Sequence, residues 1–163
     1  MVPKMSIAAL LLVVACSGDN ILSPSNLDIS ASSSVIAALP YQRTATPGIE
    51  TIVTLRNNTS QPIPVRFGDG CFDGLRIFKT ADLSGTPVYS NDGPRVCAAI
   101  GILPSALAPG ETRQATLYVA MKDVLGSSLP NGTYYVDARV TMFIPQLVSG
   151  MVDVDAGSVN LAR

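Results

Sequence analysis

The chain has 163 residues, which is enough for one hydrophobic core but not for two. Its 11 basic and 12 acidic side chains are scattered along the sequence, so the basic patch of a nucleic-acid-binding protein is absent and no nucleic-acid partner is expected. The chain contains no histidine, which removes the commonest general base and the commonest zinc ligand. With 13 glycines, 12 prolines and 14% charged residues, the composition favours strands and turns over long helices.

The first residues predict an export signal. Lys4 gives a positively charged start, and residues 6–14 form an apolar run about half as long as a membrane-spanning helix requires. The sequence Val13-Val14-Ala15-Cys16 resembles the bacterial lipobox, in which a small residue precedes a cysteine that is acylated and becomes the first residue of the mature protein. We therefore expect a signal peptide at 1–15 and a lipid anchor on Cys16. The alternative is an ordinary cleaved signal peptide with an incidental cysteine.

The residues after the cysteine indicate where the protein is displayed. Ser17 stands where an inner-membrane lipoprotein typically has aspartate. We therefore expect the protein to reside in the bacterial cell envelope, at the outer membrane in particular. Residues 16–26 are small and polar and are expected to form a flexible tether. Residues 27–163 are then expected to form one domain.

Beyond the tether, apolar residues recur with a period of two between clusters of Pro, Gly, Asn and Asp, which is typical of strands and turns. This pattern predicts an all-β, immunoglobulin-like antiparallel β-sandwich of about seven to eight strands. Residues 27–39 either pair as the first strand or extend the tether. The expected strands are 27–39, 50–57, 63–67, 75–79, 87–90, 112–121, 133–144 and 150–161.

Two further cysteines, Cys71 and Cys97, form an even pair in an exported chain, where disulfides persist. We expect one disulfide between them, with two buried free thiols as the alternative. In the strand 133–144, the alternation places Asp137 and Arg139 on the face toward water. Asn57, Asn58 and Asn131 are interpreted as turn residues.

Residues 49–144 resemble the BsuPI-type intracellular proteinase inhibitor domain, a bacterial immunoglobulin-like sandwich. The resemblance depends on the order of several turn-and-strand pieces, and it implies the sandwich fold more specifically than it implies inhibition. The chain departs from the family in its export signal, its cysteine pair and its lack of tryptophan, and no inhibitory loop carries over residue by residue. The pieces are Leu55-Arg56-Asn57-Asn58-Thr59-Ser60, Pro62-Ile63-Pro64-Val65-Arg66-Phe67, Phe72-Asp73-Gly74-Leu75-Arg76-Ile77, Gly85-Thr86-Pro87-Val88-Tyr89-Ser90, Leu107-Ala108-Pro109-Gly110-Glu111-Thr112 and Leu129-Pro130-Asn131-Gly132-Thr133-Tyr134-Tyr135-Val136.

Carboxylates occur at two places that could carry chemistry. Asp69 and Asp73, with Asp92, could offer oxygen ligands to calcium, but they lack the graded ligand series of an EF-hand, so we expect solvated turn residues and no metal. Asp153 and Asp155 lie two apart in an expected strand and share a face, which could make a paired-carboxylate device. We interpret them as a solvent-facing rim.

The serine hydroxyls and one apolar segment are equally weak candidates for a functional site. The serines at 30–34 and 127–128 lack a histidine to activate them, which leaves only a Ser-Lys pair using Lys79 or Lys122. Residues 143–148 form either an exposed hairpin tip suited to a partner or ordinary core at a bend, and we favour core.

Together these observations predict a non-catalytic envelope lipoprotein with no cofactor, held to the membrane through Cys16, whose sandwich binds another protein in adhesion or assembly. The alternatives are a proteinase inhibitor resembling the BsuPI type and a small-ligand or carbohydrate-binding module.

Overall fold

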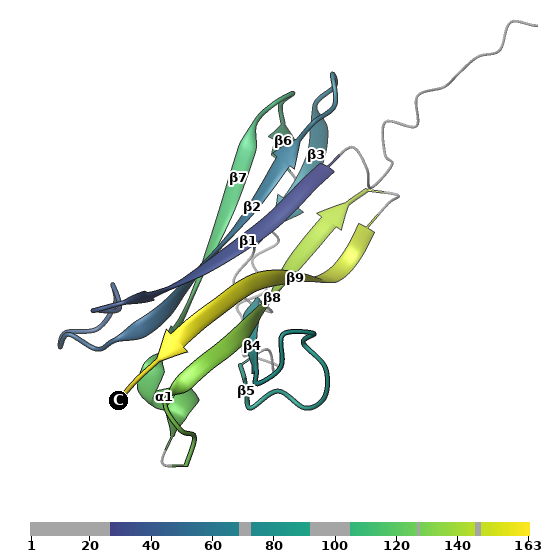
Figure 1. The fold of residues 1–163 in the computed structure, drawn as a ribbon. Coiled ribbons are helices and arrows are strands. Elements are labelled where there is room, and N and C mark those ends of the chain that lie inside the picture. Colours follow the sequence, from purple (N-terminus) through teal and green to yellow (C-terminus); the bar gives the residue numbers. More distant parts are fainter. Residues whose placement is uncertain (1–26, 69–72, 92–104, 127, 146–147) are drawn as a thin grey trace, which may run out of the picture.

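The computed structural model describes residues 27–68, 73–91, 105–126, 128–145 and 148–163. Figure 1 shows two packed antiparallel sheets, which confirms the predicted all-β sandwich. The described residues form nine strands instead of seven or eight, and one short helix. The elements are β1 (Leu27–Ile36), β2 (Gly48–Asn57), β3 (Ile63–Phe67), β4 (Gly74–Phe78), β5 (Tyr89–Ser90), β6 (Ser105–Leu107), β7 (Thr112–Ala120), α1 (Met121–Leu125), β8 (Gly132–Ile144) and β9 (Val148–Leu161).

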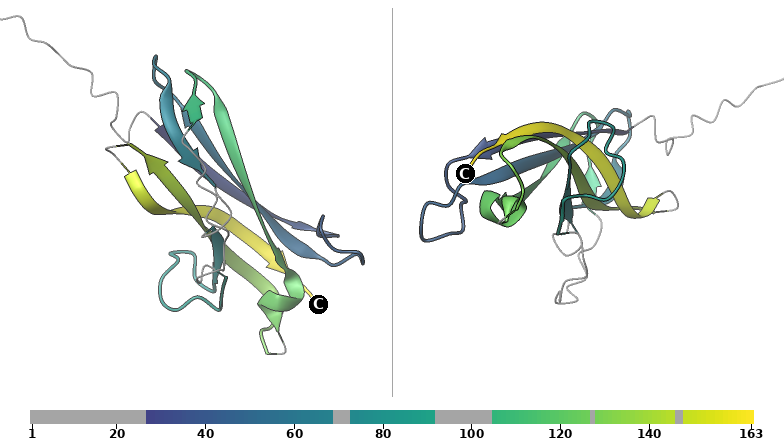
Figure 2. Two further views of the ribbon diagram at one scale, coloured as in Figure 1. Left: turned by 180° about the vertical axis from the view of Figure 1, so that it is seen from behind. Right: turned by 60° about the horizontal axis from the view of Figure 1, so that its bottom comes forward.

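The two sheets differ in size. Three strands pair in the order β1-β2-β7, and the other six pair as β5-β4-β8-β3-β6 with β9 on the remaining edge of β8. Strand β1 runs beside β9, so the sheets approach each other along that margin (Figures 1 and 2). Strands β7 and β5 are edge strands of the two sheets, and both contribute residues to an open groove.

The first strand settles the choice that the sequence left open. Residues 27–36 pair antiparallel with β2, from Leu27 opposite Asn57 to Ile36 opposite Gly48. Its inward residues, such as Ile29, are half-buried, whereas alternate residues such as Ser30 are exposed. Strand β1 therefore belongs to the sheet, and its apolar period of two places one face on the core.

The core lies between the sheets and is built by the alternation that the sequence shows. Val53 and Leu55 of β2 and Val136 of β8 are fully buried. Tyr134 is also buried, and its hydroxyl donates a 2.6 Å hydrogen bond to the carbonyl of Pro130, which lies just before β8. A buried tyrosine that bonds the backbone a few residues upstream is a feature of immunoglobulin-like sandwiches, because it fixes the corner where a strand enters the second sheet.

Asn57 differs from the turn residue that the sequence predicts. It is fully buried at the end of β2. Its side-chain Nδ2 donates 2.8 Å hydrogen bonds to the carbonyls of Gln61 and Leu107, and its Oδ1 accepts from the backbone and hydroxyl of Thr59. Asn57 therefore joins β2 to β6 across the fold. Asn58 is exposed and Asn131 caps the backbone N–H of Arg163, as turn residues do.

Among the described residues, no helix is long and apolar enough to cross a membrane.

Candidate functional site

Three of the residues that the sequence singles out, Cys16, Cys71 and Cys97, lie outside the described residues, as do Asp69 and Asp92. The lipid anchor, the disulfide and the full calcium-site hypothesis therefore remain predictions. The described part of the chain holds no group of three or more His, Cys, Asp or Glu side chains that could bind a metal ion.

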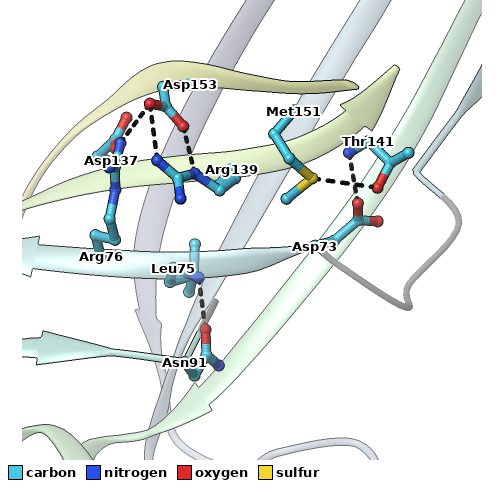
Figure 3. A network of polar contacts seen from close by, with 9 residues as sticks. All are labelled: Asp73, Leu75, Arg76, Asn91, Asp137, Arg139, Thr141, Met151 and Asp153. Atoms are coloured by element: carbon cyan, nitrogen blue, oxygen red, sulfur yellow. Dashed lines mark hydrogen bonds and ion pairs between the residues drawn. The ribbon is translucent and has the colours of Figure 1, made fainter. Parts of the chain in front are cut away.

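Asp73 is not a solvated turn residue, contrary to the expectation. It is buried, and its Oδ1 accepts a 2.7 Å hydrogen bond from the backbone N–H of Thr141 (Figure 3). The neighbouring backbone bond runs from the N–H of Gly68 to the carbonyl of Thr141. Asp73 thus serves as an acceptor for β8 between its pairings with β3 and β4. Its carboxylate has a structural role there.

Asp137 and Arg139 lie on the outer face of β8, as the alternation predicts, but Asp137 does not face water. It is 3% exposed because Arg76 of β4 covers it, and the Arg76 Nε donates a 2.8 Å hydrogen bond to Asp137 Oδ2. Asp153 of β9 lies 2.7 Å from Arg76 and also accepts from Arg139 at 2.7 and 3.2 Å (Figure 3). Two arginines and two aspartates therefore form a charge-balanced network over three strands, which we name the arginine–aspartate network.

The pKa values in this network are shifted in opposite directions. Burial raises the pKa of Asp137, although the hydrogen bond and charge of Arg76 act to lower it. Hydrogen bonds from Arg139 and Arg76 lower the pKa of Asp153. The second carboxylate of the suspected pair, Asp155, accepts a 2.9 Å hydrogen bond from the N–H of Gly157. Asp153 and Asp155 thus each bind their own neighbouring groups, and their geometry does not support a paired-carboxylate device.

The remaining sequence candidates are not assembled into a site either. Lys79 and Lys122 are exposed, and the Oγ atoms of Ser33 and Thr51 hydrogen-bond each other at 2.8 Å. In the segment 143–148, Ile144 is 1% exposed and Phe143 is half-buried. The described side chains of that segment fit the favoured core interpretation.

A tyrosine-lined groove is the arrangement that sequence reasoning missed. Tyr41 from the β1–β2 loop, Tyr118 of β7 and Tyr89 of β5 line an open groove of about 290 Å³. Its wall therefore comes from an edge strand of each sheet, β7 and β5, and from the loop between β1 and β2. Polar side chains share the lining with the rings. They are Gln42, Asn91 and Asp123, the last on α1. We name this surface the tyrosine groove.

The loop that carries Tyr41 is held in place by the contacts of Leu39. Leu39 is buried, and its backbone N–H donates a 2.9 Å hydrogen bond to the carbonyl of Thr46. Gly48 makes this packing feasible, because a Cβ there would collide with Leu39 and with the carbonyl of Val119. The loop is thereby positioned against β7 while the side chain of Tyr41 remains 87% exposed.

The tyrosine rings have a defined geometry. The centroids of Tyr41 and Tyr118 lie 5.9 Å apart with their planes at 83°, an edge-to-face contact that aromatic pairs favour. The hydroxyl of Tyr118 donates a 3.0 Å hydrogen bond to Glu50 Oε1, the residue opposite it in the β2–β7 pairing. This bond raises the pKa of Tyr118 and fixes the ring on which Tyr41 rests.

A second, more apolar hollow of about 370 Å³ lies beside α1, and Met121, Leu125 and Arg163 contribute to its lining. The guanidinium of Arg163 donates hydrogen bonds of 2.9 to 3.2 Å to the carbonyls of Leu125, Gly126 and Leu129. It therefore satisfies carbonyl groups at the C-terminal end of α1 and just beyond it. The tyrosine groove offers more to a ligand because it combines aromatic faces with polar side chains.

The sequence carries no local signal for the tyrosine groove. Its three tyrosines belong to a loop and to two strands in different sheets, and none forms a motif with its neighbours. The absence of tryptophan removes one kind of aromatic platform, but it does not exclude a surface assembled from tyrosines.

Comparison with known proteins concerns the fold. No family matches the chain, and neither does any curated protein. Solved structures that resemble it are the ApaA protein from Bordetella pertussis (TM-score 0.40, 19% identity, covering 83% of this chain and 92% of that one), and structural genomics target SoR45 (0.39, 11%, 85% and 88%). The C-terminal domain of Wzt also resembles it (0.43, 15%, 85% and 74%). The chain thus shows a distant structural similarity to small β-sandwich proteins.

Proposed function

We propose that this chain is a lipid-anchored, non-catalytic envelope protein whose β-sandwich binds another protein through the tyrosine groove. The observation that carries the proposal is Tyr41, whose ring stands 87% exposed while resting edge-on against Tyr118. Aromatic side chains usually bury their large apolar area, and tyrosine is enriched at the residues that dominate protein interfaces. An exposed tyrosine that packs edge-on against one tyrosine and shares a groove with another is therefore a suitable anchor for a partner.

The position of the groove also suits protein binding. It lies where edge strands of the two sheets, β7 and β5, both contribute to the lining. Loops and strand ends on a rigid sandwich commonly carry recognition, because the sheets hold them in place. The hydrogen bond between Tyr118 and Glu50 reduces the ordering that binding would require on this side.

The anchoring part of the proposal depends on Cys16 and on the tether 16–26. Acyl chains on Cys16 would hold the protein at a membrane surface, with the sandwich displayed beyond the tether. In that compartment a disulfide between Cys71 and Cys97 would persist.

The BsuPI resemblance supports the same fold more than it supports inhibition. Within the described residues, the long exposed loop between β4 and β5 closes on itself, because the N–H of Leu83 donates to the carbonyl of Thr80 and that of Ser84 donates to Asp82 Oδ1. Leu83 has a positive φ of 54° in this turn. A substrate-like inhibitor presents an extended strand to a proteinase, so this compact loop favours the adhesion or assembly role over inhibition.

Photo-crosslinking in intact cells tests the proposed function. The full chain would carry p-benzoylphenylalanine in place of Tyr41 or, as a control, in place of Val35, which is 43% exposed on β1 and does not line the groove. We expect one protein of the envelope to crosslink from position 41 and not from position 35, with crosslinking lost when Asp123 is also replaced by Arg. Identical products from both positions, or none from position 41, would refute binding at the groove.

A further inference from the structure

We infer that the partner enters the tyrosine groove with an extended, proline-containing segment that carries a basic residue. The inference rests on the proposed function and adds the chemistry of the bound segment. Four features of the groove support it: the angle between its rings, its size, its polar groups and its charge.

The angle between the rings gives the first argument. At 83°, Tyr41 and Tyr118 form a corner instead of a flat platform. A flat sugar ring stacks best on an exposed aromatic face, whereas a compact pyrrolidine ring can pack into the angle between two perpendicular rings. Proline-rich segments are recognised in this general way, by grooves lined with aromatic side chains.

The size of the groove gives the second argument. Its volume of about 290 Å³ lies just below the roughly 300 to 1,000 Å³ of pockets that enclose small ligands, and the groove is open. Its lining extends from the loop bearing Tyr41 across β7 to Tyr89 of β5. An open, shallow groove of this size suits a short length of chain that crosses it and continues on both sides.

The polar groups give the third argument. A polyproline II segment makes no internal hydrogen bonds, so its carbonyl groups face outward and need donors. The exposed side chain of Gln42 lies in the groove lining beside the tyrosines and carries an amide that can donate to such a carbonyl. Asn91 lies in the same lining, and its Oδ1 accepts a 2.6 Å hydrogen bond from the N–H of Leu75. Gln42 therefore supplies the donor, and Asn91 forms part of the wall on β5's side of the groove.

The charge of the groove gives the fourth argument. Asp123 is the charged side chain among the described residues that line the groove, and it is exposed. The carboxylate of Glu50, outside the lining, accepts the hydrogen bond of the Tyr118 hydroxyl. The exposed carboxylate of Asp123 beside aromatic rings favours a segment with lysine or arginine, because the cation can interact with both carboxylate and ring.

Fluorescence anisotropy with the full chain in detergent tests the inference. The probes are fluorescein-labelled peptides that cover the possible Pro-x-x-Pro spacings with one arginine at either end, each matched by a peptide with alanine for every proline and by one with glutamate for arginine. We expect at least one proline peptide to bind, its alanine counterpart to bind about tenfold more weakly and its glutamate counterpart about threefold more weakly.

Protein variants assign the binding to the groove. Tyr41→Ala should weaken the best peptide about tenfold, and Asp123→Asn should abolish the preference for arginine over glutamate. Val35→Ala and Asp28→Asn change exposed residues on β1 outside the groove and should leave the affinity unchanged. Circular dichroism of each variant confirms that the fold is retained.

Two results of these binding experiments would overturn the inference. One is equal binding of the proline and alanine peptides. The other is that none of the proline peptides binds, and binding of cello- or chito-oligosaccharides that Tyr41→Ala removes would then assign the groove to carbohydrate. A crosslinked protein at position 41 that lacks any proline-containing segment at the crosslink would also refute the inference while leaving the proposed function standing, whereas the absence of crosslinks refutes the proposed function itself.

Discussion

The carboxylate of Asp73 and the backbone N–H of Thr141 are joined by a buried 2.7 Å hydrogen bond, at the point where β8 stops pairing with β4 and begins pairing with β3. An N–H left without an acceptor inside a sheet costs free energy, because it loses water and gains nothing in return. Asp73 therefore supplies an acceptor for the N–H of Thr141, which lies between the residues of β8 that pair with β4 and those that pair with β3.

Replacing Asp73 tests this role. Asp73→Ala removes the acceptor of a buried N–H and should lower the free energy of unfolding by about 2 to 3 kcal/mol. Asp73→Asn keeps an oxygen that can accept the same bond and should cost about half as much. Urea unfolding measures both. Equal losses for the two variants would mean that the charge of Asp73, and not its acceptor oxygen, matters at this position.

Asn57 and Asn58 provide a matched pair, because they are adjacent and differ in burial. Asn57→Asp replaces the two donors to Gln61 and Leu107 with an acceptor and places a carboxylate against two carbonyl oxygens. We expect a loss of about 3 kcal/mol at pH 7, decreasing as the pH falls, because protonation removes the charge and restores one donor. Asn58→Asp should change the unfolding free energy by less than about 0.5 kcal/mol. Similar losses at both positions would contradict the assignment.

Asp73 and Asn57 show what the sequence can and cannot predict. Alternation along β2 and β8 predicts which side chains share a face, and the structure bears this out for Val53, Leu55 and Val136. It does not predict whether another strand covers the outer face. The N–H of Thr141 that binds Asp73 and the carbonyl of Leu107 that binds Asn57 belong to segments far away in the sequence, so these partners meet only when the sheets assemble.

The same limit applies to the arginine–aspartate network and to the tyrosine groove. Asp137 alternates like a solvent-facing residue, but its burial comes from Arg76 of β4 and Asp153 of β9. Tyr41 and Tyr118 are brought together by a loop that folds over β7. Strand β6 was missed for a different reason, because three residues are too few for a period of two to be recognised.

The network predicts opposite pH effects for its two aspartates. The pKa of Asp153 is lowered in the folded chain, so its contribution is present above about pH 4 and is lost as the pH falls through the folded pKa. Asp153→Asn should therefore lower the unfolding free energy by about 1 kcal/mol at pH 7, a value reduced by its solvent exposure, and should flatten the acid limb of the stability curve. Asp28→Asn, on an exposed position of β1, is the control and should change neither.

Asp137 should behave in the reverse sense. Burial raises its folded pKa, so its contribution to stability falls as the pH rises from about 4 through the folded pKa. Asp137→Asn removes this pH dependence. At pH 7 it should change the free energy of unfolding by less than about 1 kcal/mol, because asparagine keeps an oxygen that can accept the Arg76 Nε hydrogen bond and removes the buried charge. Urea unfolding between pH 3 and 7 measures both variants, and a parallel pH profile for the two would contradict the opposite shifts.

The cysteine pair predicts a chemical result that needs no structure of its segment. If Cys71 and Cys97 are bridged, iodoacetamide should label neither in the unfolded chain until a reductant is added, and mass spectrometry should then show two added groups. Reduction should lower the free energy of unfolding by about 3 to 4 kcal/mol in the loop-entropy treatment. Labelling of both thiols without reductant would establish the free-thiol alternative.

Cys16 predicts where the protein resides in the cell. If Cys16 is acylated, Cys16→Ser removes the lipid and should move the protein from the membrane fraction to the soluble fraction, because the tether and sandwich are not expected to bind a bilayer alone. Immunoblots of fractionated cells measure the shift, and labelling with an alkyne palmitate analogue should mark the wild type and not the variant. Ser17→Asp separates anchoring from sorting, because it should keep the label and move the protein toward the inner membrane. Retention of Cys16→Ser in the membrane fraction would contradict the anchor, even if the signal at 1–15 is cleaved.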